Sequence, residues 1–276
     1  MTRTPERVGF IGLGSQGAPM ARRIVDAGFP TTLWARRPAS LEPFAGTPAK
    51  PAPTPADLAA ESDLVCVCVV DDDDVTEVLT GDGGVLAGLP AGGVIAVHST
   101  VHPDTCRRLA ERAAAQDVTL VDAPVSGGGP AAAEGRLLVM AGGDEGTVDR
   151  CRPVFAAYAD PILHLGPVGA GQVAKLLNNV LFTANLATAV DALALGRALD
   201  VDPGTLAQVL TRGSGASFAL ERIGAAGGTI DLIAAHAGRL LRKDVRLTKA
   251  LTGAAGAPEG AAIAAAEAAL TLMNQD

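Results

Sequence analysis

The chain has 276 residues and a formal net charge of −8, with 48% hydrophobic and 19% charged residues. This composition excludes a disordered chain, which would combine low hydrophobicity with high charge. The acidic balance argues against nucleic acid or an anionic membrane surface as a partner, and no run approaches the roughly 18 apolar residues of a membrane span. The N-terminal residues carry no secretory leader pattern, and Cys66 and Cys68 are a poor disulfide pair. We therefore expect reduced thiols in a cytoplasmic protein.

The first two thirds of the chain alternate short β-branched runs with helical patterns. Candidate strands are residues 7–11, 31–35, 64–70, 94–98, 119–122 and 137–141, and 161–165 is expected to end the sheet. Candidate helices are residues 18–27, 56–61, 75–79 and 103–116. Strands that alternate with helices predict βαβ units and a mostly parallel sheet.

The remainder of the chain is helical in pattern. A glycine-rich segment at 166–171 leads into a candidate helix at 172–199, and further helical patterns follow at 203–210, 216–225, 230–252 and 260–273. We expect an α/β domain over residues 1–166 and an all-α domain over 167–276. The long helix would span about 40 Å with apolar residues on more than one face. We therefore expect a homodimer or a larger homo-oligomer such as a tetramer.

A glycine motif joins the first strand to the first helix. Gly12-Leu13-Gly14-Ser15-Gln16-Gly17 has the G-x-G-x-x-G spacing of dinucleotide-binding loops. Gly12 permits the tight turn, Gly14 lets the backbone approach a pyrophosphate, and Gly17 allows close helix packing. The alternative is a purely structural turn, but the strand-to-helix context favours a Rossmann-type dinucleotide site.

The end of the second candidate strand bears on which dinucleotide binds. NAD sites usually place an acidic residue there for the ribose 2′-hydroxyl, but this chain has Arg36 and Arg37. Two guanidinium groups favour a 2′-phosphate, so NADP(H) is expected over NAD(H). The alternative is a solvated basic turn, and a shift of one residue at the strand end would give the role to Arg37.

Four segments resemble one family in the family's own order. Residues 10–21, FIGLGSQGAPMA, resemble the opening signature of the β-hydroxyacid dehydrogenases, the family of 3-hydroxyisobutyrate dehydrogenases and tartronate semialdehyde reductases. Residues 122–128, DAPVSGG, resemble the family's substrate segment, and residues 166–179, GPVGAGQVAKLLNN, resemble its catalytic segment. Lys243-Asp244 is similar to the family's C-terminal Lys-Asp pair. The resemblance implies transfer of a hydride between a nicotinamide cofactor and a small 3-hydroxy acid or semialdehyde.

The resemblance also implies roles for individual residues. Lys175 would be the acid/base, which as a base requires burial or a neighbouring positive charge to favour the neutral amine. Asn179 lies four residues later, on the same helix face, and would bind the substrate. The same comparison assigns Ser126, Gly127 and Gly128 to the substrate carboxylate. The resemblance places Thr100 and Lys243 near the nicotinamide. Val70 and Asp71 lie at a strand end, so they are expected beside the cofactor.

Other interpretations remain open at the level of sequence. An imine reductase-like enzyme is one alternative, although that group generally lacks a lysine at the position of Lys175. A non-catalytic NADP-binding scaffold is another, motivated by Ser15-Gln16 in the glycine motif and by the short alanine-rich tail. The residues from Asp71 to Asp74 are interpreted as a solvated loop, and the four histidines lack metal-ligand spacing, so no metal site is expected.

Overall fold

The computed structural model describes residues 5–274. The chain forms two compact units, with the division between them after Lys175. The first unit contains all the described strands, and the second consists of helices. This confirms the expected combination of an α/β sheet region with a helical region.

The main sheet has six parallel strands in the order β3-β2-β1-β4-β5-β6. This is the doubly wound order in which the connection reverses between β1 and β4, so the carboxyl ends of those two strands flank a ligand crevice. The strands are β1 (Val8–Ile11), β2 (Thr31–Trp34), β3 (Lys50–Pro51), β4 (Leu64–Val67), β5 (Val94–Val97) and β6 (Thr119–Asp122). The connecting helices are α1 (Gly17–Asp26), α2 (Pro55–Ala60), α3 (Asp72–Thr80) and α4 (Pro103–Ala114).

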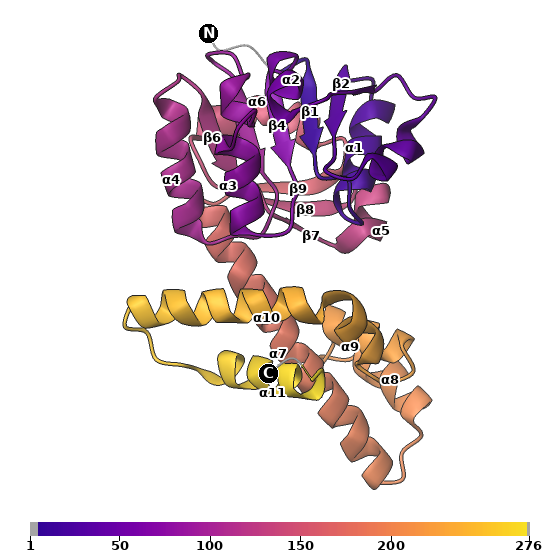
Figure 1. Cartoon of the computed structure of the whole chain (residues 1–276). Coiled ribbons are helices and arrows are strands. Elements are labelled where there is room, and N and C mark those ends of the chain that lie inside the picture. The colour runs from indigo at the N-terminus through magenta and orange to yellow at the C-terminus, as the bar shows by residue number, and fades with distance from the viewer. Residues whose placement is uncertain (1–4, 275–276) are drawn as a thin grey trace. The chain divides into compact units, whose positions relative to one another are not determined.

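Helices cover both faces of this sheet (Figure 1). Alternate residues along each strand point to opposite sides: Phe10 packs in the cluster that contains α1, and Ile11 packs in the cluster that contains α2, α3 and α4. Both side chains are fully buried. Every residue of β1, β4 and β5 is buried, which explains why these central strands are apolar without alternation.

A second sheet corrects one sequence-based expectation. The strands β7 (Val125–Ser126), β8 (Leu137–Ala141) and β9 (Ala159–His164) form a separate sheet of three strands, so the run near residue 161 does not end the main sheet. The separation arises because β7 turns back and pairs antiparallel with β8. Two helices of this region had no counterpart among the expected elements, namely α5 (Gly128–Ala133) and α6 (Glu145–Phe155).

Other boundaries also differ from the expected ones. The strand expected to reach residue 70 ends at Val67, and the acidic run expected to be a loop forms the start of α3. Asp71 is the N-cap of α3, and its carboxylate accepts the backbone N–H of Asp74 at 3.0 Å. Acidic side chains favour the first turn of a helix because they interact with its exposed N–H groups. Short 3-10 helices occur at η1 (Pro38–Phe44) and η2 (Val85–Ala87).

The second unit is built around the part of the long helix α7 (Ala170–Ala198) that follows Lys175. The remaining helices are α8 (Pro203–Arg212), α9 (Phe218–Ala225), α10 (Asp231–Ala254) and α11 (Ala261–Leu272). By length and composition α7 would suffice to cross a membrane, but nearly half of its apolar part is buried inside the protein. Leu186 and Leu193 of α7 pack in one core cluster with Leu241 of α10 and Ile263 of α11, as expected for a core helix.

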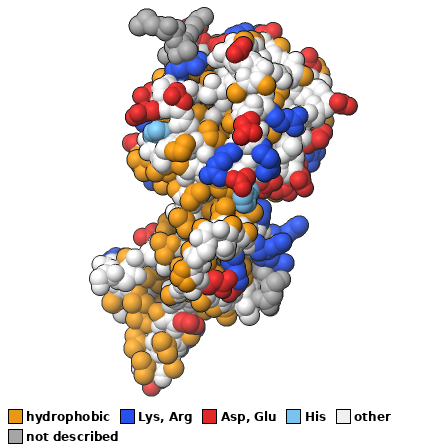
Figure 2. All heavy atoms as spheres, turned by 90° about the vertical axis from the view of Figure 1, so that its left-hand side faces the viewer, with side chains coloured by type: hydrophobic (Ala, Val, Ile, Leu, Met, Phe, Trp, Pro, Cys, Tyr) orange, Lys and Arg blue, Asp and Glu red, His pale blue; other side chains and the backbone are white. Residues whose placement is uncertain are grey.

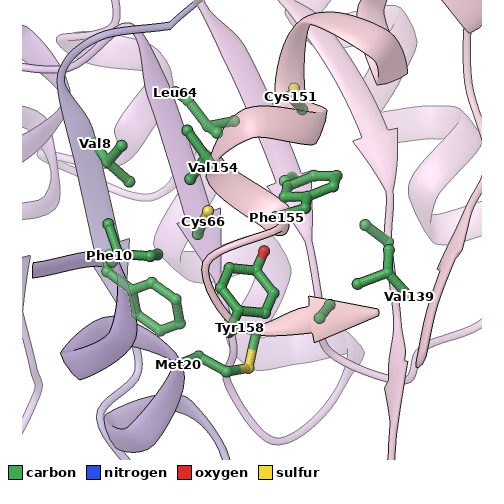
Figure 3. Packing of buried hydrophobic residues seen from close by; sticks show 14 of the residues in the cluster. Val8, Phe10, Met20, Leu64, Cys66, Val139, Cys151, Val154, Phe155 and Tyr158 are labelled. Carbon is green, nitrogen blue, oxygen red and sulfur yellow. The ribbon is translucent and has the colours of Figure 1, made fainter. Parts of the chain in front are cut away.

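A polar histidine lies in the core between the two sheets. Because the Ala123 carbonyl oxygen can only accept, Nδ1 of His98 donates to it at 2.7 Å, and Nε2 then accepts from the Tyr158 hydroxyl at 3.1 Å. Figure 3 shows Tyr158 among Phe155, Cys66 and Met20. Burial lowers the pKa of His98 to about 4. The four cysteines are free thiols whose pKa values burial raises.

A buried carboxylate joins the main sheet to the start of α7. Asp122, fully buried at the end of β6, accepts the N–H of Gly169 at 2.6 Å on Oδ1 and the N–H of Gln172 at 2.8 Å on Oδ2. The Gln172 side chain bonds the Ser99 carbonyl at 2.8 Å and accepts the Val101 N–H at 3.1 Å. Burial raises the pKa of Asp122, whereas the backbone N–H donors favour its charged form.

We expect acid to destabilise the protein partly through His98. The unfolded state binds the proton at a pKa near 6.5 and the folded state only near 4, so stability falls as the pH drops through this window. Below pH 4, the protonation of His98 in the unfolded state lowers the free energy of unfolding by about 3 kcal/mol. Urea unfolding between pH 7 and pH 4 measures it. The variant His98→Asn keeps a donor for Ala123 and should show a shallower loss; an equal slope in both proteins would refute the assignment.

Asp122→Asn should destabilise the protein by about 1–3 kcal/mol, because the new amide N–H₂ group would face a backbone N–H donor in a buried site. Urea unfolding at pH 7 provides the measurement. Asp82→Asn removes the same charge from an exposed position and should change the stability by less than about 0.5 kcal/mol. Equal stabilities for the two variants would show that the carboxylate is not needed at this junction.

Candidate functional site

The glycine loop after β1 has the backbone geometry of a dinucleotide site. Gly12 has φ +97°, and a Cβ there would lie 2.2 Å from the carbonyl oxygen of Cys68, so only glycine fits. A Cβ at Gly17 would lie 1.9 Å from the Gly12 oxygen. Among the described residues, no heavy atom lies within 4 Å of the place a Gly14 Cβ would take. The first and third glycines therefore close the turn, and the second faces open space.

The N-terminus of α1 follows this loop and suits an anion. Gln16 is the N-cap residue and makes no side-chain cap bond, and no described residue of the first turn is acidic. The Ala18 N–H donates to the Gly14 carbonyl oxygen at 2.9 Å and Pro19 has no N–H, so a phosphate here would meet the N–H of Gly17 and of the loop before it. Leu13 is buried beneath the loop, and Ser15 is exposed. The loop thus fits the pyrophosphate of a nicotinamide dinucleotide.

The side chain of Arg36 forms an ion pair at the carboxyl edge of the sheet. Its Nη2 lies 2.6 Å from Oδ1 of Asp74, in the first turn of α3. The hydrogen bond and negative charge of Asp74 raise the pKa of Arg36. The Arg36 side chain remains 65% exposed, and the Asp74 side chain is 21% exposed. Arg37, the next residue, is exposed and precedes η1. Sequence analysis did not find the role of Asp74, because nothing local pairs it with Arg36.

The other predicted cofactor residues of the first unit lie after β4 and β5. Val70 is 60% exposed between β4 and α3, next to the helix-capping Asp71. Thr100 is half-buried just after β5. The Val69 N–H donates to Oγ of Ser99 at 2.8 Å, which ties these two strand ends together. The structure therefore brings Val70, Asp71 and Thr100 to the same edge as the glycine loop.

The predicted substrate segment lies against the same loop. Ser126 ends β7 and is half-buried, and Gly127 and Gly128 are exposed with φ +128° and +76°. A Cβ at Gly129, the next residue, would lie 2.7 Å from the Ser15 carbonyl oxygen. Close contact between the two glycine-rich segments thus requires glycine at this position. Ser126 carries its hydroxyl donor three residues before this contact.

Lys175 lies near the start of α7 and is half-buried. Gln172 precedes it by three residues, about one helical turn, and its hydrogen bonds to Ser99 and Val101 fix that turn to the end of β5. Asp122 binds the same turn through the backbone. These two residues therefore position Lys175 relative to the strand ends. The sequence signal that could have identified Asp122 is its charged side chain at the end of an otherwise largely apolar strand.

Asn179, one helical turn after Lys175, is held by a residue of α10. Its Nδ2 donates to Oδ2 of Asp244 at 2.6 Å, and its Oδ1 accepts from Asn178 at 3.1 Å. Asp244 is buried, and its Oδ1 lies 3.3 Å from Nζ of Lys243. The Lys-Asp pair of the sequence thus has a structural role in which Asp244 orients Asn179. Residue types alone did not reveal that role.

The histidines have structural partners. His98 is in the core, His102 accepts the N–H of Asp104 at the start of α4, and His164 bonds the Gly143 carbonyl oxygen. His236 bonds the Leu232 carbonyl oxygen within α10. Within residues 5–274, no three His, Cys, Asp or Glu side chains gather as metal ligands.

Comparisons with known proteins agree with this geometry. Residues 7–166 match the NAD binding domain of 6-phosphogluconate dehydrogenase. Residues 169–276 match the NAD-binding domain of NADP-dependent 3-hydroxyisobutyrate dehydrogenase.

Individual relatives are also oxidoreductases or hydroxyacid dehydrogenases. An uncharacterized oxidoreductase of Mycobacterium tuberculosis is 39% identical over 76% of this chain and 72% of its own length. A 3-hydroxyisobutyrate dehydrogenase of Pseudomonas aeruginosa is 35% identical over 78% and 72%. The structure of M. tuberculosis 3-hydroxyisobutyrate dehydrogenase with L-serine superposes with a TM-score of 0.82 at 28% identity, covering 95% of this chain and 91% of that one. The chain therefore belongs to the NAD(P)-dependent hydroxyacid dehydrogenases of the 3-hydroxyisobutyrate dehydrogenase family.

Proposed function

We propose that the protein oxidises a small 3-hydroxy acid, or reduces the matching semialdehyde, with Lys175 as the acid/base. The observation that carries this proposal is the arrangement at the start of α7. The turn before Lys175 is fixed by two buried polar residues, and Asn179, one turn after it, is oriented by Asp244. A surface helix without a catalytic role would not need two amide side chains held so firmly.

The chemistry needs a proton carrier and a hydride carrier. The nicotinamide ring supplies the hydride acceptor or donor when it is bound. In the oxidative direction the neutral amine of Lys175 takes the hydroxyl proton as the C–H bond breaks. In the reductive direction its ammonium group donates a proton to the forming alcohol oxygen. Asn179 bonds the same oxygen and restricts its orientation.

A carboxylate on the substrate fits the segment after β7. The Ser126 hydroxyl and the backbone N–H groups of Gly127 and Gly128 can donate hydrogen bonds to a small anion. Relatives named for 3-hydroxyisobutyrate support a substrate whose hydroxyl lies two carbons away from the carboxylate carbon. Lys243, assigned to the cofactor by resemblance, remains part of the proposed site.

The proposed cofactor preference is NADP(H) over NAD(H), through Arg36 with help from Arg37. Arg36 follows β2, where an NAD enzyme places an acidic ribose ligand. A guanidinium there attracts a 2′-phosphate and can donate two hydrogen bonds to it. The match to an NADP-dependent domain family supports this choice.

We further propose a cytoplasmic homo-oligomer, a dimer or a tetramer. Leu181 and Leu195 of α7, Phe218 of α9 and Leu232 of α10 are more than half exposed. Figure 2 shows hydrophobic side chains gathered on the surface of the helical unit. Apolar area of this kind is covered in assemblies of identical subunits.

Lys175→Ala should lower kcat by about 10²- to 10⁴-fold, because the positioned proton carrier is lost. The affinity for NADPH should change by no more than a few-fold. The measurement is turnover of small semialdehydes and 3-hydroxy acids with either cofactor, together with NADPH titration. Lys50→Ala, at the exposed edge strand β3, is the matched control. Turnover by the Lys175 variant within a few-fold of wild type would remove this residue from the mechanism.

Arg36→Ala should weaken NADPH binding by about tenfold and change NADH binding much less. The reason is that the charged hydrogen bond to the 2′-phosphate is lost. Because the Arg36 side chain is exposed, the loss of affinity should be at the lower end of what charged hydrogen bonds contribute. Titration of both cofactors into wild type and into Arg36→Ala and Arg37→Ala assigns the role. The difference should shrink at high salt. Equal affinities for both cofactors, unchanged in either variant, would contradict the preference.

A further inference from the structure

The ion pair between Arg36 and Asp74 crosses the edge where a dinucleotide binds. Arg36 follows β2, and Asp74 belongs to α3, which follows β4. In the sheet order these two strands flank β1, the strand that leads into the glycine loop. The contact of 2.6 Å therefore joins the two segments on either side of that loop.

The carboxylate is the better fixed partner of this pair. The Asp74 side chain is 21% exposed, against 65% for Arg36. The Asp74 backbone N–H is bonded to the Asp71 carboxylate, so the first turn of α3 is held in place. The negative charges of Asp71 and Glu77 also act on Arg36. The guanidinium of Arg36 thus lies among several carboxylates.

A 2′-phosphate and a 2′-hydroxyl meet these surroundings differently. The phosphate must compete with Asp74 for the guanidinium of Arg36, and its own negative charge is repelled by that carboxylate. A ribose hydroxyl is uncharged and can donate a hydrogen bond to a carboxylate. Asp74 therefore offers NAD(H) the acidic acceptor that other NAD enzymes place at the end of the second strand.

We propose that Asp74 is a specificity-determining residue that weakens NADP(H) binding and supports NAD(H) binding. The proposal rests on the cofactor role given to Arg36 above. Together the two residues form a site in which the Arg36 guanidinium binds the 2′-phosphate of NADP(H) and the Asp74 carboxylate binds the 2′-hydroxyl of NAD(H). The preference for NADP(H) is then smaller than the arginine alone would give.

Direct titration of NADPH and NADH into the full-length protein, without substrate, tests the proposal. Asp74→Asn keeps the size of the side chain and removes its charge. It should tighten NADPH binding about three- to tenfold and weaken NADH binding, and an unchanged NADH affinity would overturn the support proposed for NAD(H). Asp73→Asn is the matched control, because Asp73 is exposed in the same turn and the described contacts of Arg36 do not include it. This control should shift the ratio of the two affinities less than twofold.

An error in the role of Asp74 and an error in the proposed function give different results. A gain for NADPH in Asp74→Asn that shrinks in an Arg36→Ala background supports the ion pair as its cause. Equal shifts in the Asp73 and Asp74 variants, or none in Asp74→Asn, overturn the proposal while the assigned dehydrogenase activity stands. If wild type binds neither cofactor, the proposed function itself fails. Retained NADH binding shows that each variant is folded.

Discussion

The carboxylate of Asp122 joins the sheet that binds the cofactor to the helix that carries the proposed acid/base. Its two oxygens accept N–H groups from Gly169 and Gln172, on either side of the first residues of α7. A buried carboxylate is costly unless its hydrogen bonds are satisfied. The chain must therefore bring the start of α7 to the end of β6 in one register. The position of Lys175 follows from that register.

Glycines allow this approach. A Cβ at Gly171 would lie 2.2 Å from the carbonyl oxygen of Met140, and one at Gly142 would lie 2.5 Å from Oδ1 of Asp122. These two glycines, one at the start of α7 and one directly after β8, thus have a packing function. The Gly143 N–H also donates to the Gly166 carbonyl oxygen at 2.9 Å, so the junction depends on small residues, backbone hydrogen bonds and one carboxylate.

The parallel sheet could be predicted because its signals are local. Apart from β3, whose two residues are exposed and which was not among the expected strands, each strand is a short apolar or β-branched run, and the glycine loop follows β1 within a few residues. The second sheet could not be predicted in the same way. Val125 pairs with Val139 across a helix and a turn, and two-residue strands such as β7 have too few residues to show a pattern. The acidic run after β4 forms a helix start and not the expected loop, because its capping residues are common to loops and to helix starts.

The candidate site shows the same division between local and distant information. The glycine loop and the Lys175–Asn179 spacing are sequence motifs, so they could be found by pattern. The partners that orient those residues come from segments far away in the chain: Asp244 is 65 residues from Asn179, and Asp74 is 38 residues from Arg36. Sequence motifs therefore identify the groups proposed to contact cofactor and substrate. The charges beside those groups are set by the fold, because the carboxylate of Asp74 reaches Arg36 only through tertiary structure.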